Sequence, residues 1–447
     1  MKGNCLRAIL IFSSLVVLAS PVFATSWPLV PLDSVHPLGN NWGNYQDYSG
    51  GFNPYFHNGI DVITPGAQGR RVSAVRHGWV KGWGTIDAEY HYRLAICDTS
   101  SDFTGRAEGW LYAHIDSARW HRNLGDEVQE GDSIGYLVPW GGGFDHCHFA
   151  RISDTGATWM RFPDVTWWFI QNPLTIIRPN TDLVAPVIQN ARTGQKFAFC
   201  RNNRNNSYMR YDSLVGEVDI IARVYDKTGS STGDSTWDKL APYEVDYSVK
   251  REDGLVVVPW TIGVQFSNRL DGSLVNVVYK ADNTCQSQGD YSYREYYYIV
   301  TNTDGDSIIE RTDTSGVWNT GIVGDTTYWV YVRASDVSGN TTIDSMQVRT
   351  HNGVAVQEPP FAVLSRPLRA VPVAGRSGLI SFGTAGSGTV RLHVYDPTGR
   401  IVADLADGWL SAGEHRFSFA SPSSGVYVVK LTLDGKDTYS AKLVALR

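Results

Sequence analysis

Three kinds of pattern are missing from the sequence, and each absence excludes a class of protein. After residue 24 no run of about 18 uninterrupted apolar residues remains, so we expect no membrane span there. The formal net charge is −6, whereas a nucleic-acid-binding protein normally carries a basic face, so that class is not indicated. No helical period of useful length is present, which leaves strands as the main expected element.

The N-terminus carries the one long apolar segment of the chain. Lys2 and Arg7 form a basic start, the run AILIFSSLVVLAS follows, and Val22-Phe23-Ala24 is a small-residue cleavage signal. This pattern predicts a secretory signal peptide over residues 1–24. Cys5 lies before the apolar core and not at the cleavage point, which argues against a lipoprotein anchor.

Four cysteines follow residue 24, and export would permit their oxidation. Cys97 and Cys147 fall in one region and Cys200 and Cys285 in another, which makes these the natural pairings. Four cysteines allow three connectivities, however, and the sequence does not choose among them.

Glycine is plentiful, with 44 residues, and aromatic residues make up 12% of the chain, which together favour short strands and turns. The length allows about three domains. We predict a mainly β protein with a first β domain over 25–183, an immunoglobulin-like β-sandwich over 184–352, a linker over 353–372 and a small C-terminal β-sandwich over 373–447. In the middle unit, strands end at turn clusters such as D226-K-T-G and D336-V-S-G-N. No titratable cluster is apparent there, so a spacer or binding module is expected.

The segment Asp145-His-Cys-His-Phe-Ala150 places two histidines one residue apart where strand character is expected. Side chains at positions i and i+2 of a strand point to the same face, so His146 and His148 would face one spot and Cys147 the other side. Chance would explain such a pair unless further metal ligands lie elsewhere in the chain.

Two upstream segments offer such ligands. His57-Asn-Gly-Ile-Asp61 carries a histidine and a carboxylate, and its glycine favours a loop entering a strand over a helix. Tyr112-Ala-His114 places another histidine at the end of an apolar strand. Two histidines and one aspartate suit Zn²⁺ and leave a fourth position for water, which is typical of a catalytic site. Further histidines are then free to act as a general base or to stabilise an oxyanion.

The order H-x-x-x-D, Y-x-H and H-x-H-F resembles the motifs of the lysostaphin-type (LytM-like) zinc metallo-endopeptidases. The likeness covers roughly residues 36–152 and includes G125-D-E-V-Q-E-G and I134-G, which are similar to the family's hairpin before the H-x-H. It implies a LytM-like antiparallel β-sheet peptidase domain over 25–183. It also implies that His57, Asp61 and His148 bind Zn²⁺ and that His114 and His146 are the catalytic pair.

Some features lie outside the family pattern. Ala150 stands where relatives often carry glutamate, and the stretch 87–108 is longer than in compact relatives, although neither includes a ligand. The segment Gly141–Gly143 is interpreted as a rim of the groove or as a plain hairpin turn. The remaining histidines of this region are interpreted as surface or supporting residues, two of them near the cleft (His36 and His91) and two elsewhere (His77 and His121).

The last 75 residues or so contain V394-Y-D-P-T-G-R, S411-A-G-E-H and S424-G-V-Y. These resemble the C-terminal sorting domain of type IX secretion. The resemblance implies the type IX machinery as a partner and a secreted or outer-surface location in a Gram-negative-type bacterium. A plain immunoglobulin-like module is the alternative, and it would leave the protein in the periplasm.

Together the resemblances predict a secreted zinc metallo-endopeptidase that hydrolyses peptide bonds in peptidoglycan cross-links, with stem or cross-link peptides as its partners. Two alternatives stay open. One is a non-catalytic cell-wall-binding or hydrolase-activating protein, which would have no need to keep both His114 and His146. The other is an endopeptidase that acts on glycine-rich proteins.

Overall fold

The computed structural model describes residues 25–48, 53–64, 70–84, 92–100, 106–119, 122–140, 144–155, 166–352, 364–373, 377–386, 388–433 and 437–445. Strands hold 51% of the residues and helices 6%, so the predicted mainly β class is confirmed. The predicted signal peptide, His91, His121 and the segment 141–143 lie outside the described residues. Within the described part of the chain, no helix combines the length and apolar character needed to cross a membrane.

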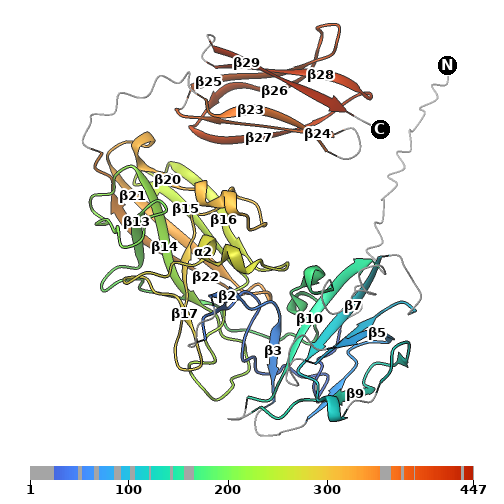
Figure 1. Cartoon of the computed structure of the whole chain (residues 1–447). Helices are drawn as coiled ribbons and strands as arrows, with labels where there is room; N and C mark the ends of the chain where they lie inside the picture. The colour runs from blue at the N-terminus through green and yellow to red at the C-terminus, as the bar shows by residue number, and fades with distance from the viewer. Residues whose placement is uncertain are drawn as a thin grey trace, which may run out of the picture.

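The first unit, blue to cyan in Figure 1, is built on a seven-stranded antiparallel sheet. The strand order is β11-β10-β7-β6-β5-β8, and β3 pairs with β10 on the side opposite β7. The strands are β3 (Ile60–Ile63), β5 (Gly78–Gly84), β6 (Arg93–Cys97), β7 (Arg106–Ala113), β8 (Glu127–Val128), β10 (His146–Thr155) and β11 (Ile170–Gln171).

Two small antiparallel sheets and three 3₁₀ turns are the other elements among the described residues of this unit. The pairs are β1 (Tyr45–Gln46) with β2 (Tyr55–Phe56) and β4 (Arg71–Ser73) with β9 (Ser133–Tyr136). The turns are η2 (Ser117–Arg119), η4 (Thr166–Phe169) and η5 (Pro173–Thr175).

The second unit consists of two antiparallel sheets whose inner faces share one core. One sheet contains β12 (Val187–Gln189), β13 (Phe197–Arg201), β14 (Glu217–Tyr225), β19 (Tyr297–Ile299) and β20 (Trp318–Asn319). The other contains β15 (Glu244–Arg251), β16 (Val256–Gln265), β21 (Thr327–Ser335) and β22 (Thr341–Arg349). Short elements connect them: η6 (Gly272–Leu274), α2 (Val275–Val278), β17 (Gln288–Gly289), β18 (Arg294–Glu295), η7 (Arg311–Ser315) and η8 (Thr320–Ile322).

The first two units share a hydrophobic core. Trp42 and Phe56 of the first unit are buried in the same cluster as Phe266 and Tyr279 of the sandwich. The Tyr279 hydroxyl donates a hydrogen bond to the Gly43 carbonyl at 2.6 Å. Gly43 has a φ of +86°, and a Cβ there would lie 2.5 Å from the Phe266 ring. This shared core holds the sandwich against the first unit, which a simple spacer would not require.

The third unit is a separate β-sandwich with its own core. Its sheets are β23-β24-β27 and β26-β25-β28-β29. The strand β23 begins at Leu364, inside the stretch 353–372 predicted as linker, so that boundary is corrected. Pro367 and Pro372 suggested a linker, but an edge strand tolerates proline because one row of its N–H groups needs no partner. The strands are β23 (Leu364–Val373), β24 (Ser377–Thr384), β25 (Gly388–Tyr395), β26 (Ile401–Leu410), β27 (Gly413–Ala420), β28 (Gly425–Leu433) and β29 (Asp437–Ala445).

All four cysteines that follow residue 24 are buried free thiols. Cys97 and Cys147 belong to different hydrophobic clusters, so the structure does not form the first suggested bridge. Cys200 and Cys285 share one cluster but are also unbridged.

Candidate metal centre and cleft

Strand pairing places four side chains in one row across the first sheet. Asp61 of β3 lies directly opposite His148 of β10, and His148 in turn lies opposite Ala113 of β7. Arg93 of β6 lies opposite Ala113. Because directly opposed residues share a face of a sheet, Arg93, Ala113, His148 and Asp61 face the same side, and all four line one cleft.

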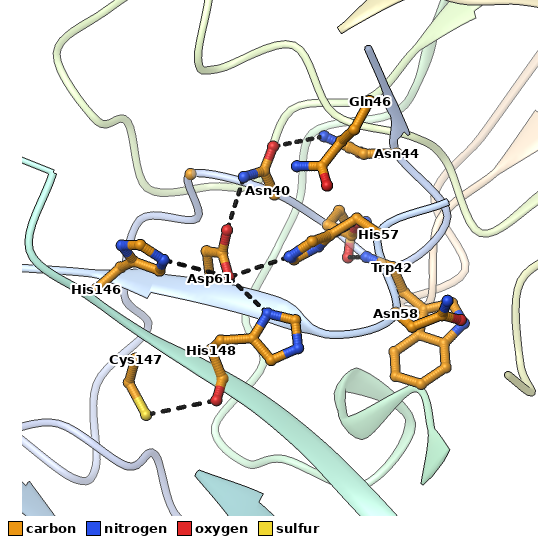
Figure 2. A network of polar contacts seen from close by, with 12 residues as sticks. Asn40, Trp42, Asn44, Gln46, His57, Asn58, Asp61, His146, Cys147 and His148 are labelled. Carbon is orange, nitrogen blue, oxygen red and sulfur yellow. Dashed lines mark hydrogen bonds and ion pairs between the residues drawn. The ribbon is translucent and has the colours of Figure 1, made fainter. Parts of the chain in front are cut away.

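The three predicted metal ligands converge at one end of this row (Figure 2). His57 Nε2 lies 3.1 Å and His148 Nδ1 lies 3.0 Å from Asp61 Oδ1. The three ligand atoms lie within 4.8 Å of one another, and all three residues are buried. The structure therefore brings together His57, Asp61 and His148, from a loop and two neighbouring strands.

Neighbouring groups fix the orientation of these ligands. His57 Nδ1 lies 3.2 Å from the Asn41 carbonyl oxygen, and donation to that oxygen leaves Nε2 to face the cluster. Asn40 Nδ2 donates to Asp61 Oδ2 at 2.6 Å, and Arg294 of the sandwich donates to Asn40 Oδ1 at 2.9 Å. Hydrogen bonds of this kind set the tautomer and the aim of metal ligands. The sandwich thus helps to orient the site.

Gly59 leaves room for the His148 ring. A Cβ at position 59 would lie 2.2 Å from His148 Nε2 and 2.3 Å from Cε1, far inside van der Waals contact. The glycine between His57 and Asp61 is therefore a packing requirement of the cluster.

The electrostatics of the cluster suit a cation. Burial alone would raise the pKa of Asp61, but His57, His146 and His148 outweigh it and hold the pKa well below its usual range. Burial lowers the pKa of His148 to about 4, although its hydrogen bond with Asp61 opposes the shift. At neutral pH the result is a carboxylate beside a neutral imidazole, which are the forms that bind metals. Two imidazoles and one carboxylate are a donor set of catalytic zinc sites, so these residues fit Zn²⁺.

The other two predicted residues lie beside the cluster. His146 Nδ1 is 2.7 Å from the Phe144 carbonyl oxygen, and its Nε2 faces Asp61 Oδ1 at 3.8 Å. The centroid of the His114 ring lies 4.5 Å from that of His146. His114 follows the end of β7 and has a φ of +64°, a conformation uncommon for residues with a Cβ. Regular alternation after Ala113 would aim His114 at the opposite face, so this local turn brings it to the site.

The cluster lies in a cleft of about 580 Å³ whose walls come from two units. Trp140 and Phe144 line it from the first unit, and Arg269, Leu270 and Tyr291 line it from the sandwich. No local pattern joins Arg269, Leu270 and Tyr291 to metal-site residues more than a hundred positions away, and Trp140 and Phe144 carry no motif of their own. The aromatic richness of the chain could have suggested only the rings among them.

The histidines outside the motifs do not line the cleft in the described part of the chain. His36 is buried, with its Nε2 2.9 Å from the Pro31 carbonyl oxygen, and it is not among the residues that line the cleft. His77 is a surface residue paired with Glu127 at 2.7 Å, as expected. The Cys147 side chain is buried in the hydrophobic core of the first unit, as predicted from the alternation of side chains along β10.

Comparisons with known proteins give weak similarities. No protein-family model matches the chain, and no curated protein matches it. Among solved structures, the catalytic domain of the antimicrobial peptidase lysostaphin from Staphylococcus simulans is 20% identical; the match covers 29% of this chain and 86% of that domain, with a TM-score of 0.21. A zinc-containing peptidase from Vibrio cholerae is 22% identical over 27% of this chain and 37% of its own, with a TM-score of 0.18. A single-site mutant of the catalytic domain of the prophage-encoded M23 protein EnpA from Enterococcus faecalis is 20% identical over 28% of this chain and 86% of its own, with a TM-score of 0.20.

Proposed function

We propose that the chain is a zinc metallo-endopeptidase that hydrolyses peptide bonds in peptidoglycan cross-links. The observation that carries this proposal is the convergence of His57 Nε2, Asp61 Oδ1 and His148 Nδ1 in a cleft that also contains the rings of His114 and His146. In such a site a zinc ion polarises a carbonyl and lowers the pKa of water toward about 7.

The chain's own residues supply the proton chemistry. His146 donates its Nδ1 hydrogen to the Phe144 carbonyl, which leaves Nε2 as a base that faces the cluster. His114 lies next to it and is positioned to stabilise negative charge on a substrate oxygen as an imidazolium or to pass on a proton. Arg93 adds a positive charge in the same row and lowers the pKa of His148 further.

The shape of the cleft supports an extended peptide as substrate. A volume of about 580 Å³ admits several residues, and its walls carry aromatic rings and Arg269. We further propose export to the outer surface of a Gram-negative-type bacterium through the C-terminal unit, by the type IX machinery. The alternative location for the enzyme is the periplasm.

The decisive experiment is digestion of purified sacculi of several cross-link types, with mass spectrometry of the products. We expect new N-termini within cross-links, and we expect the Asp61→Ala variant to lose both zinc and activity. The control is Asp253→Ala, which changes an exposed carboxylate of the sandwich. Zinc binding without cleavage of any cross-link would favour a non-catalytic cell-wall-binding or hydrolase-activating protein. Cleavage of glycine-rich proteins alone would favour an endopeptidase that acts on such proteins. Unchanged activity in Asp61→Ala would refute the site.

A further inference from the structure

We propose a second cation site, for Ca²⁺, at the junction of the first unit and the sandwich, built from Asp182, Asp226 and Asp336. No titratable cluster is apparent in the sequence of the middle unit, and the structure corrects this expectation. One carboxylate oxygen from each of the three residues lies within 4.8 Å of the others, and all three residues are buried.

The fold brings these aspartates together from three separate segments. Asp226 follows the end of β14 and Asp336 follows the end of β21, so each closes a strand of a different sheet of the sandwich. Asp182 lies in the segment that connects the first unit to β12. In the sequence, Asp226 and Asp336 each begin a turn cluster, which is an ordinary position for aspartate. Nothing in either segment therefore indicated that the two lie close together.

A small cavity of about 20 Å³ lies at the centre of this group, which is room for one ion or water. Its lining adds further oxygen donors from Asn41, Asn180, Thr228 and Ser338, together with apolar walls that include Trp27. Ca²⁺ takes about six to eight oxygen ligands, and the three carboxylates alone carry six oxygens.

No basic side chain compensates the charges of the group within the described lining of the cavity. No lysine, arginine or histidine is among the described residues that line the cavity. Asp226 is 3% exposed, and its Oδ1 has no hydrogen-bond partner there. Asp182 accepts a hydrogen bond from Val184 N, and Asp336 accepts two from Asn340, so the other two carboxylates are held in place. A buried, unpartnered carboxylate oxygen aimed at two other carboxylates is costly unless a cation joins them.

The pKa values of Asp182 and Asp226 are raised by burial and by repulsion between the carboxylates. Burial, with Asp336 as a second cause, raises the pKa of Asp182 to about 6. Burial, with Asp336 and Asp182 as further causes, raises the pKa of Asp226 well above its usual range. A divalent cation would relieve this repulsion.

The donor chemistry favours Ca²⁺. The three proposed ligands are carboxylates, which offer hard oxygens without the nitrogen or sulfur that Zn²⁺ prefers. Mg²⁺ usually keeps several waters and binds through one or two carboxylates, whereas three carboxylates around a cavity with room for one ion suit Ca²⁺.

Ca²⁺ bound here would tie both sheets of the sandwich to the connecting segment from the first unit. The same sandwich supplies Arg294 to the orientation of Asp61 and part of the cleft wall. The site would therefore stabilise the junction on which the cleft depends.

The test uses the full chain loaded with zinc and titrated with CaCl₂. Isothermal titration should show one Ca²⁺ per chain with a Kd between about 10⁻⁶ and 10⁻³ M. At about 100 times the Kd, the Tm should rise by about 5 °C. Tb³⁺ should replace Ca²⁺ and give emission excited through tryptophan, because Trp27 lines the cavity. The Asp226→Asn variant should lose all three responses, and the exposed control Asp253→Asn should keep them.

The behaviour without calcium separates a metal site from a merely structural cluster. Asp226→Asn removes a buried negative charge and keeps the shape, so its calcium-free Tm should equal or exceed that of the wild type. Full calcium binding by Asp226→Asn would overturn the proposal. If that variant does not fold, the wild-type titration decides: no saturable Ca²⁺ binding and no tryptophan-excited Tb³⁺ emission displaced by Ca²⁺ would overturn it equally.

Discussion

Replacing Gly59 with alanine tests whether the His148 ring must sit where the structure places it. The new Cβ would lie 2.2 Å from Nε2, 2.3 Å from Cε1 and 2.9 Å from Cδ2 of His148. Ordinary contacts begin near 3.4 Å, so the ring must move by about 1 Å. That movement carries Nδ1 away from its position 3.0 Å from Asp61 Oδ1.

The size of the effect follows from this displacement. Misplacing a reacting or ligating group by about 1 Å costs about a hundredfold in rate, and misaimed ligands lose about 10- to 100-fold in metal affinity. Overpacking a buried site costs about 1–3 kcal/mol of unfolding free energy. We therefore expect Gly59→Ala to fold, to bind zinc more weakly by one to two orders of magnitude and to cleave its substrate about a hundredfold more slowly.

The assay pairs zinc titration against a competing chelator with kinetics and urea unfolding. Gly425→Ala is the matched control, because a Cβ there has no neighbour within 4 Å and its φ is not positive. If Gly59→Ala kept wild-type zinc affinity and turnover, the ring would not be confined as described, and the packing argument for the motif would fail.

Three further predictions concern the same cleft. His114→Ala should keep its zinc and lose turnover about a hundredfold or more, since the ring acts on the substrate and not on the metal; loss of metal in an elemental assay would contradict that role. Tyr291→Ala should raise KM several-fold with kcat and zinc content unchanged, because this ring lines the cleft from the sandwich, and an unaltered KM would argue against a shared wall. Burial lowers the pKa of His148 to about 4, so as the pH falls from about 6.5 the unfolded metal-free chain takes up a proton before the folded chain does. The free energy of unfolding should thus drop by about 3 kcal/mol between about pH 6.5 and 4, and urea titrations of His148→Gln should lack that part of the loss.

The proposed metal ligands could be identified from the sequence, whereas the residues that surround them could not. The H-x-H pair follows strand alternation, so the shared face of His146 and His148 could be predicted from the residues themselves. His57 lies in a loop, and its convergence with Asp61 and His148 was implied only by the resemblance. The end of β14 at Tyr225 was also predictable, because the turn cluster that begins at Asp226 follows it directly. The positive φ of His114 was not, because nothing in Tyr112-Ala-His114 marks a left-handed residue.

Long-range partners escaped prediction for a physical reason. Asn40 and Arg294 are 254 positions apart, and their hydrogen bond depends on the docking of two units rather than on local pattern. The aspartate triad is a similar case, because each member has a complete local explanation as a turn or connector residue. Such a group is identified by its burial and by the absence of a basic side chain beside it. Neither property can be read from the local sequence around each aspartate.

The sandwich contributes to the proposed metal centre. Its Arg294 donates a hydrogen bond to Asn40, which donates one to the second oxygen of Asp61, so one hydrogen-bond chain runs from the sandwich to a proposed metal ligand. The shared core around Trp42 and Tyr279 fixes the docking that this chain requires. Because the same docking also places Arg269 and Tyr291 in the wall of the cleft, the proposed metal binding and substrate recognition should both depend on one interface. A change that loosens this junction should therefore impair both together, even though it touches neither the metal ligands nor the substrate.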